Sequence, residues 1–408
     1  MEYQKLVVNM NKYSPLFRYF LQKKYNMLEL ILKTDYYKGN YYFFGGVKRF
    51  MERLFNFSAG PAALPLSVLE EAQRDLLCYP GAGCSVMEMS HRSRPYEEII
   101  EETEATLRRI MNIPDDYAVV FCQGGATMQF SMAAMNYARQ GQKAAHAVNG
   151  VFSKKAFEEA SRWCDAYKIV DTKTSVPEIT EDMILPGTAY LHITGNNTTS
   201  GTMYRKLPEH GETPLIGDWT SGILGTEIDV RDYALVYAGA QKNMGPAGVA
   251  VAIFKRGSVL PDIDPIVPSL LRYETMDKTG SMLNTPPTFA IYMCGLVYKW
   301  VEEQGGVSEL EKLNIKKSQI LYDVIDSSKL YKGIADKDCR SIMNVTFTLP
   351  DDESTNAFLE MAKKRGMISL AGFRSVGGIR ASIYNGMPIE GVECLAQCMV
   401  DFEKGYRE

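Results

Sequence analysis

Lys242 lies in the segment AGAQKNMGPAG (238–248), between two apolar runs that predict buried strands (233–237 and 249–254). An ammonium group buried at such a junction loses its hydration, and its pKa falls by roughly 3–5 units when nothing compensates. The neutral amine that results is a nucleophile. The position therefore predicts a reactive lysine; the alternative is an ordinary lysine at the exposed end of a strand.

Gly124 and Gly125 separate a predicted strand (117–123) from a predicted helix that begins near Ala126 and Thr127. The free N–H groups at the start of a helix bind anions, phosphate above all. Because Gly-Gly turns are common, a plain turn between strand and helix is the alternative interpretation of this stretch.

Asp218 ends another apolar run, PLIGDW (214–219). A carboxylate at the end of a buried strand needs a cation or several donors, such as a protonated pyridine nitrogen; the alternative is a cap for the next helix. The carboxyl ends of neighbouring strands in an open α/β sheet face one crevice. We expect one crevice to bring together the helix start that can bind phosphate, this carboxylate and Lys242. That combination predicts pyridoxal 5'-phosphate as cofactor.

Apolar strands alternate with amphipathic helices from about residue 54, which predicts an α/β fold with a mostly parallel sheet covered by helices. We expect a large cofactor-binding domain over 66–311 and a smaller C-terminal α+β domain over 312–408, with 51–65 packing near it. The sheet strands are expected at 117–123, 143–149, 167–171, 188–194, 214–219, 234–240 and 249–254.

The composition excludes several classes of function. The formal net charge of −4 gives no reason to expect nucleic-acid binding, and no apolar run reaches the ~18 residues that span a membrane. The 8 cysteines contain no C-x-x-C pair and are interpreted as reduced thiols of a cytoplasmic protein. The 4 histidines have no ligand-like spacing, so we expect no metal site.

Five motifs from residue 51 to residue 408 resemble the phosphoserine aminotransferase family, whose members are class V, fold-type I, pyridoxal-phosphate enzymes. The resemblance implies reversible transamination between glutamate and 3-phosphohydroxypyruvate, which gives phosphoserine and 2-oxoglutarate in serine biosynthesis. It also implies a homodimer with shared active sites, and it leaves open a related substrate of vitamin B6 synthesis. The motifs are FNFSAGPAALP (55–65), SVMEMSHRS (85–93), VYAGAQKNMGPAG (236–248), NTPPTFAIY (284–292) and VGGIRASIYNGMP (376–388).

The same resemblance assigns roles to residues. Lys242 matches the Schiff-base lysine and Asp218 the partner of the pyridine nitrogen, and these two are the expected catalytic residues. Other matched positions hold the cofactor: Ala126, Thr127 and Gln241 at its phosphate, Asn284 and Thr285 at that phosphate from the other subunit, and Phe152 and Thr198 beside its ring. The matched substrate-binding residues are His91, Arg92, Arg374 and Arg380, with Arg380 expected to hold the α-carboxylate in a bidentate fork.

Two positions depart from the family pattern. Phe373 stands where many members have histidine, which removes one phosphate donor, and Thr127 stands where some have arginine. The nearest alternative enzymes are a cysteine desulfurase, which needs a cysteine on a loop near the substrate, and a serine–glyoxylate aminotransferase. A non-catalytic protein that keeps the fold for binding is the alternative from a different class.

Residues 1–50 differ in composition from the rest of the chain, because they contain no alanine and are rich in Tyr, Asn, Lys, Phe and Leu. A/T-rich DNA read as codons gives such a composition, and Gly45 and Gly46 can be encoded by a ribosome-binding sequence upstream of Met51. We expect this extension to be disordered or not translated; the alternative is a genuine basic extension, such as an organelle-targeting segment.

A chain that begins at Met51 is expected to keep cofactor binding, dimerisation and activity, because no matched site residue precedes that position. Cofactor absorbance and turnover of the shortened chain measure this, and failure to bind the cofactor would contradict it. Mass spectrometry of the native protein tests the start itself: peptides from the stretch between Tyr3 and Lys48 would show that the extension is translated.

Overall fold

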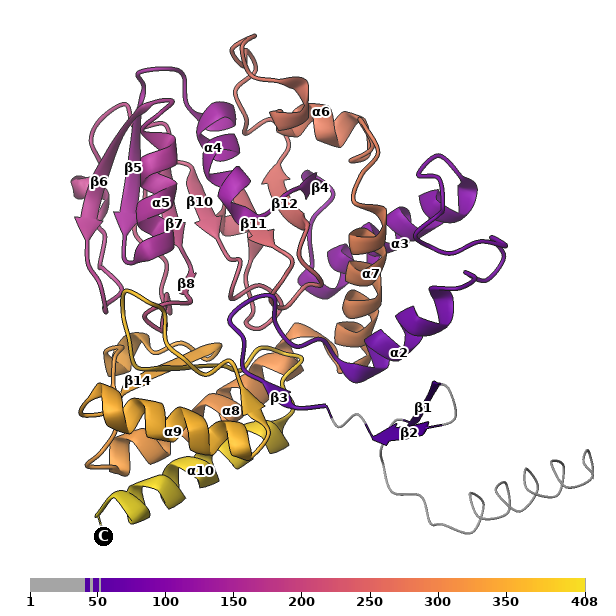
Figure 1. Ribbon diagram of the computed structural model, residues 1–408. Helices are drawn as coiled ribbons and strands as arrows, with labels where there is room; N and C mark the ends of the chain where they lie inside the picture. Colours follow the sequence, from indigo (N-terminus) through magenta and orange to yellow (C-terminus); the bar gives the residue numbers. More distant parts are fainter. Residues whose placement is uncertain (1–40, 45–46, 51–52, 408) are drawn as a thin grey trace, which may run out of the picture. The chain divides into compact units, whose positions relative to one another are not determined.

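The structure is a computed structural model that describes residues 41–44, 47–50 and 53–407. The chain divides into two compact units, residues 1–54 and 55–408. The described part of the first unit is an antiparallel pair of strands, β1 (Tyr41–Phe44) and β2 (Val47–Phe50) (Figure 1). The remaining residues of the expected N-terminal extension lie outside the described part of the chain.

The second unit is built around a seven-stranded sheet with the strand order β4-β12-β11-β10-β7-β5-β6. Strand β12 runs antiparallel to both of its neighbours, and the other pairs are parallel. The expected mostly parallel sheet and its seven strands are therefore confirmed. The strands are β4 (Tyr117–Gln123), β5 (Lys143–Val148), β6 (Asp165–Asp171), β7 (Leu191–Thr194), β10 (Leu215–Asp218), β11 (Leu235–Gly239) and β12 (Val249–Lys255).

Alternation along the buried strands gives the sheet two apolar faces. In β4, Val119 and Phe121 belong to one apolar cluster, whereas Ala118 and Val120 belong to another. The first cluster includes residues of α3 and α7, and the second includes residues of α4 and α5, so helices cover both faces. These helices are α3 (Arg94–Met111), α4 (Ala126–Tyr137), α5 (Val151–Ala160) and α7 (Thr288–Glu303).

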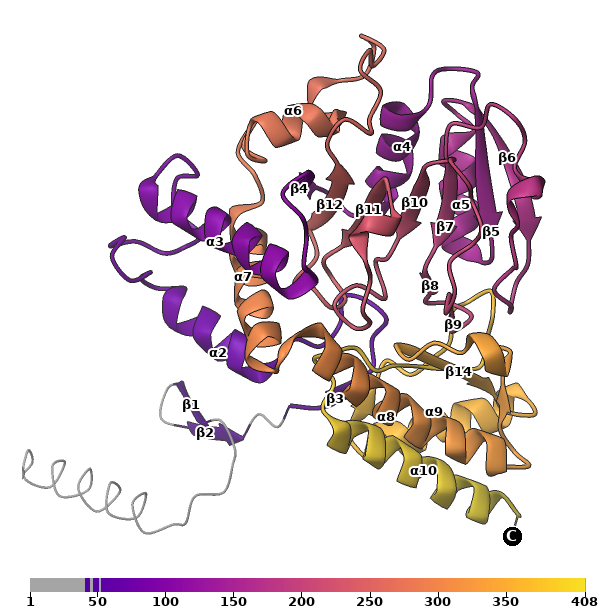
Figure 2. The same ribbon diagram turned by 180° about the vertical axis from the view of Figure 1, so that it is seen from behind.

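The C-terminal elements form a second layered body around an antiparallel sheet of order β13-β14-β16. Figures 1 and 2 show helices α8, α9 and α10 gathered about β14 at one end of the large sheet. The expected start of a smaller domain, residue 312, lies inside α8. The elements are α8 (Gly306–Ser327), β13 (Lys332–Gly333), β14 (Asn344–Thr348), α9 (Asp352–Lys364), β15 (Met367–Ile368), β16 (Ile379–Ser382) and α10 (Ile389–Arg407).

Strand β3 (Phe55–Asn56) pairs in parallel with β15, so the first residues of this unit are joined to the strand that follows α9. From β3 the chain runs along the rim of the large sheet before it enters α2. The other short elements are α2 (Leu66–Asp75), β8 (Asn196–Asn197), β9 (Thr202–Met203) and α6 (Tyr273–Lys278). Among the helices that the structure describes, none is long and apolar enough to cross a membrane.

Candidate active site

A pocket of about 260 Å³ lies where the carboxyl ends of β4, β7, β10 and β11 meet the C-terminal sheet. Parallel strands present their carboxyl ends at one edge of a sheet, so residues far apart in sequence converge there. Eight of the sequence-predicted site residues line this pocket: Ala126, Thr127, Phe152, Thr198, Asp218, Gln241, Lys242 and Arg380.

Lys242 stands in the loop that leaves β11 and is 8% exposed. Its Nζ donates a hydrogen bond to Thr198 Oγ1 at 2.5 Å. Burial lowers the pKa of Lys242 to about 8, although the nearby carboxylate of Asp218 acts in the opposite direction. A substantial fraction of this amine is therefore neutral, and nucleophilic, near physiological pH.

Asp218 is the last residue of β10 and is 4% exposed. Its Oδ1 accepts a hydrogen bond from the N–H of Thr220 at 3.0 Å. Burial raises the pKa of the Asp218 carboxyl, opposed by the bonds from Thr220 and by the charge of Lys242. A cationic ligand at this carboxylate would offset its desolvation, because an opposite charge within a few ångströms favours the ionised form.

Helix α4 begins at the pocket with Gly125 as its N-cap, and no side chain among the described residues caps it. The N–H groups of Ala126 and Thr127 come before the first intrahelical hydrogen bond, which Met128 donates to the Gly125 carbonyl, and they lie at the positive end of the helix dipole. Gly125, Ala126 and Thr127 all line the pocket. This end of the pocket is therefore suited to a phosphate group.

Two polar atoms at the pocket are left without a protein partner. Thr194 Oγ1 and Arg380 Nε are buried, and neither has a hydrogen-bond partner among the described residues. Burial lowers the pKa of the Arg380 guanidinium, but arginine stays charged in proteins. Unsatisfied buried groups cost free energy, so a ligand with acceptor oxygens would complete both.

An aromatic wall closes one side of the pocket. The rings of Phe152 and Phe373 are 6.4 Å apart, and the Arg380 guanidinium carbon lies 6.0 Å from the ring of Phe373. Lys242 Nζ lies 5.8 Å from the ring of Phe152. A planar heteroaromatic ring fits against such a surface. With the helix start, Asp218 and Lys242, the donor set fits each group of pyridoxal phosphate.

Five predicted site residues do not line the pocket: His91, Arg92, Arg374, Asn284 and Thr285. Gln123, at the end of β4, donates from Nε2 to Asn284 Oδ1 at 2.9 Å and to the Thr285 carbonyl at 3.1 Å. His91 and Arg92 precede α3, and Arg374 is the exposed neighbour of Phe373.

The pocket also contains residues that sequence reasoning did not assign to it. Ala59 and Gly60 line it, and a Cβ on Gly60, whose φ is +134°, would stand 3.4 Å from Lys242 Cγ. These residues lie in the family motif FNFSAGPAALP (55–65), so the motif pointed to this segment, but no site role had been assigned to either residue. The other unassigned lining residues are Phe130, Thr194, Asn196, Thr220 and Ser221, and Gly125 and Phe373, which had been considered from the sequence, line the pocket too.

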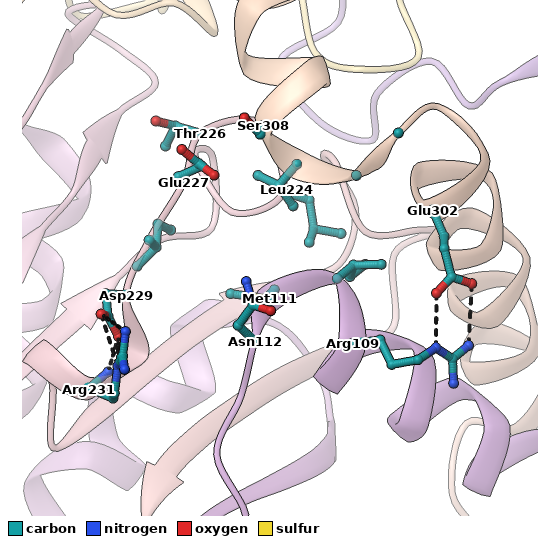
Figure 3. Close-up of a pocket in the computed structure, with 15 residues that line it drawn as sticks. Arg109, Met111, Asn112, Leu224, Thr226, Glu227, Asp229, Arg231, Glu302 and Ser308 are labelled. Carbon is teal, nitrogen blue, oxygen red and sulfur yellow. Dashed lines mark hydrogen bonds and ion pairs between the residues drawn. The ribbon is translucent and has the colours of Figure 1, made fainter.

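A larger hollow of about 590 Å³ lies elsewhere, between the carboxyl end of α3, the loop after Leu224 and the start of α8. Figure 3 shows four of its charged groups paired with each other: Arg109 Nε donates to Glu302 at 2.9 Å, and Arg231 pairs with Asp229 (Figure 3). None of the sequence-predicted site residues lines it. Size alone therefore does not identify the chemical centre, and the smaller pocket carries the reactive groups.

Comparison with known proteins relates the chain to one group of enzymes. The model of the family "Aminotransferase class-V" matches residues 54–395. The phosphoserine aminotransferase of Bacillus cereus is 47% identical over 357 residues, covering 86% of this chain and 99% of its own. The phosphoserine aminotransferase of Geobacillus kaustophilus is 47% identical over 363 residues, covering 87% of this chain and 100% of its own.

Solved structures agree with these relatives. The phosphoserine aminotransferase of Bacillus circulans subsp. alkalophilus superposes with a TM-score of 0.84 at 42% identity, covering 87% of this chain and 100% of its own. The phosphoserine aminotransferase of Trichomonas vaginalis, solved with pyridoxal phosphate bound, has a TM-score of 0.81 at 33% identity, covering 85% and 100%.

The lowered pKa of Lys242 predicts the pH at which its amine becomes reactive. In cofactor-free protein, trace acetylation of Lys242 should rise with pH through a midpoint near 8, because only the neutral amine attacks. A lysine in a model peptide serves as reference, with a midpoint of about 10.4. Peptide mass spectrometry across a pH series gives both curves, and coincident midpoints would contradict the burial argument.

Proposed function

The chain belongs to the class-V aminotransferase family, and we propose that its buried pocket carries out the transamination after which the phosphoserine aminotransferases, to which it is 47% identical, are named. It is a pyridoxal-phosphate-dependent aminotransferase that interconverts glutamate and 3-phosphohydroxypyruvate with 2-oxoglutarate and phosphoserine, a step of serine biosynthesis. Nothing in these likenesses calls for the related vitamin B6 substrate.

One observation carries the proposal: a buried lysine with a lowered pKa, a buried carboxylate, an uncapped helix start and an arginine line a single pocket. Each group alone has an ordinary explanation. Together they complement the aldehyde, ring nitrogen and phosphate of the cofactor and the carboxylate of an amino acid.

Bound pyridoxal phosphate supplies an electrophilic aldehyde and a ring that accepts electrons from the substrate's Cα. The first turn of α4 at Ala126 and Thr127 would hold its phosphate, with Gln241 across the pocket. Asp218 would hold a proton on the ring nitrogen, because its buried carboxylate is stabilised by a cation. Phe152 and Thr198 would fix the plane of the ring, and Lys242 would bind the aldehyde carbon.

Lys242 Nζ would also move the proton in both half-reactions. Its free amine would take the proton from the substrate's Cα. A lysine with its pKa near 8 is matched to that task, since a general base works best when its pKa lies near the working pH. Thr198, which accepts a hydrogen bond from Nζ, would orient the amine.

The substrates are anions, and Arg380 is the arginine that lines the pocket. We propose that its planar fork grips the α-carboxylate common to every substrate. Arg92, Arg374 and His91 would recognise the phosphate. Because Arg92 and His91 lie outside the pocket lining of their own chain, they would reach a pocket in a second copy.

A homodimer with shared active sites is the assembly we propose. Asn284 and Thr285 are exposed and lie beside the strand that leads into the phosphate-binding turn. Large apolar side chains are exposed next to the matched residues: Leu283 before Asn284 is 39% exposed, Met128 after Thr127 is 44% exposed, and Met87 in the motif 85–93 is 60% exposed. Contact with a second copy would cover them. We also propose that the enzyme is cytoplasmic, from its membership of this family.

The alternatives find less support. A cysteine desulfurase needs a cysteine near the substrate, and the described lining of the pocket includes none. Phe373, which takes the place of a phosphate-binding histidine in many relatives, lines the pocket beside Arg380. Affinity for the phosphorylated substrate would therefore depend more heavily on arginine.

The proposed activity is tested by its two half-reactions. Holoenzyme loaded with glutamate should lose the absorbance of the cofactor–lysine linkage, and 3-phosphohydroxypyruvate should restore it faster than unphosphorylated keto acids. Lys242→Ala should lower turnover by at least ~10²–10⁴-fold, the usual contribution of a general base, while the exposed Lys255→Ala should not. Turnover like that of the wild type in Lys242→Ala would remove this lysine from the mechanism.

Arg380→Lys keeps the charge but loses the planar fork. Both half-reactions should weaken by roughly 10–100-fold, the equivalent of a charged hydrogen bond worth about 1.5–3 kcal/mol. Arg92→Ala should weaken the phosphorylated substrates much more than glutamate. Stopped-flow measurement of each half-reaction separates the two, and equal losses for both substrates in Arg92→Ala would contradict this division of roles.

A further inference from the structure

Lys317 is a second buried lysine, remote from the pocket lining. It lies in the middle of α8, and its side chain is fully buried. Its Nζ donates three hydrogen bonds to carbonyl oxygens, those of Ile383 and Tyr384 at 3.0 Å and that of Met387 at 3.2 Å. None of the described carboxylates pairs with Lys317, and burying an unpaired ammonium is costly; burial lowers the pKa of Lys317 to about 7.

The three carbonyls belong to one segment, residues 383–387, which joins β16 to α10. That segment continues directly from the strand that carries Arg380. Tyr384 OH donates to the carbonyl of Ala59, a residue of the pocket lining, at 3.2 Å. A Cβ on Gly386 would meet the Ala63 carbonyl at 2.2 Å, so the segment also packs closely against the chain that leads away from the pocket.

The same segment touches the loop of the reactive lysine. The N–H of Asn385 donates to Asn243 Oδ1 at 3.0 Å, and Asn243 directly follows Lys242. Asn385 Nδ2 donates to the carbonyl of Leu224 at 2.7 Å. One turn before Lys317 on α8, Asn314 Nδ2 donates to Asn385 Oδ1 at 2.8 Å. Helix α8 therefore forms hydrogen bonds to the segment 383–387 from two positions, Lys317 and Asn314.

We propose that Lys317 is a positioning residue for transamination: by fixing the segment 383–387, it sets the place of Arg380 relative to Lys242. This inference rests on the proposed function. The segment is the covalent continuation of the strand of Arg380 and a hydrogen-bonded neighbour of the Lys242 loop. A shift of that segment would change the distance between Arg380, which binds the substrate carboxylate, and the amine of Lys242. Lys317 itself touches neither substrate nor cofactor.

The hydrogen-bond count explains why a lysine fits here. Protonated Lys317 offers three N–H donors to the three carbonyls, and the neutral amine still offers two; an apolar side chain of the same length would leave all three carbonyls without that donor. Misplacement of reacting groups by ~1 Å costs on the order of 10²-fold in rate. Loss of the hydrogen bonds from Lys317 should therefore lower the rate of catalysis as well as the stability of the fold.

The test compares Lys317→Met with Lys316→Met, its exposed neighbour on the same helix. Kinetics are expressed per bound cofactor, so that unfolded protein does not count. We expect kcat/KM for glutamate and for the phosphorylated keto acid to fall together by at least about 10-fold in Lys317→Met, with KM raised through Arg380 and kcat lowered through Lys242. The pH titration of the cofactor–lysine absorbance should also shift. Lys316→Met should match the wild type in all of these.

A purely structural role gives a different result: a lower melting temperature with unchanged kcat/KM per bound cofactor and an unchanged titration, and that outcome overturns the proposal. If Lys317→Met does not fold, Asn314→Ala, which releases the other grip on the segment, is measured in the same way, and wild-type values there overturn it equally. A wild-type protein that fails to transaminate the phosphorylated substrate would count against the proposed function, whereas cofactor affinity and titration of the variants would still test Lys317.

Discussion

Lys242 and Asp218 are both almost completely removed from water, and burial disfavours the charged form of each. They tolerate one another because they have opposite signs and because the pocket supplies hydrogen bonds from Thr220 and to Thr198. The architecture keeps this arrangement in place. Parallel strands bring β10 and β11 to one edge, the start of α4 offers its N–H groups beside them, and the C-terminal sheet adds a cation from a third direction.

A buried polar network joins the two sheets around that site. Asn344 of β14 donates to Ser382 Oγ at 3.0 Å and to Tyr384 OH at 3.1 Å, and it accepts from Asn196 Nδ2 at 2.9 Å. Ser341 Oγ donates to Asn196 Oδ1 at 2.6 Å. Asn196 lines the pocket, so the strand of Arg380 is tied to the large sheet by groups that find partners only in this arrangement. Directional bonds of this kind specify geometry where apolar packing alone would allow sliding.

Much of the fold was predictable because buried strands leave a clear apolar pattern. All seven strands of the large sheet, and the helix that begins after Gly125, were expected from that pattern and are confirmed. Lys242 and Asp218 were predicted as site residues because each is a charged residue at the end of an apolar strand. Arg380 was found by family resemblance, since nothing local in β16 says that it faces the pocket. Tertiary contacts could not be read from sequence: the grip of Lys317 on the segment 383–387 depends on a helix and a loop about 66 residues apart.

The pairing of β3 with β15 has a consequence for the order of folding. Phe55 and Asn56 pair as a strand with Met367 and Ile368, so the link closes over some three hundred residues of chain. Contacts of such long sequence separation form late, because the loop-closure entropy must be overcome first. Ala59 and Gly60, which wall the pocket beside Lys242, follow β3 directly. During synthesis the large sheet can therefore assemble while its active site is still open, and the wall formed by Ala59 and Gly60 is fixed only after β15, which follows α9, has left the ribosome.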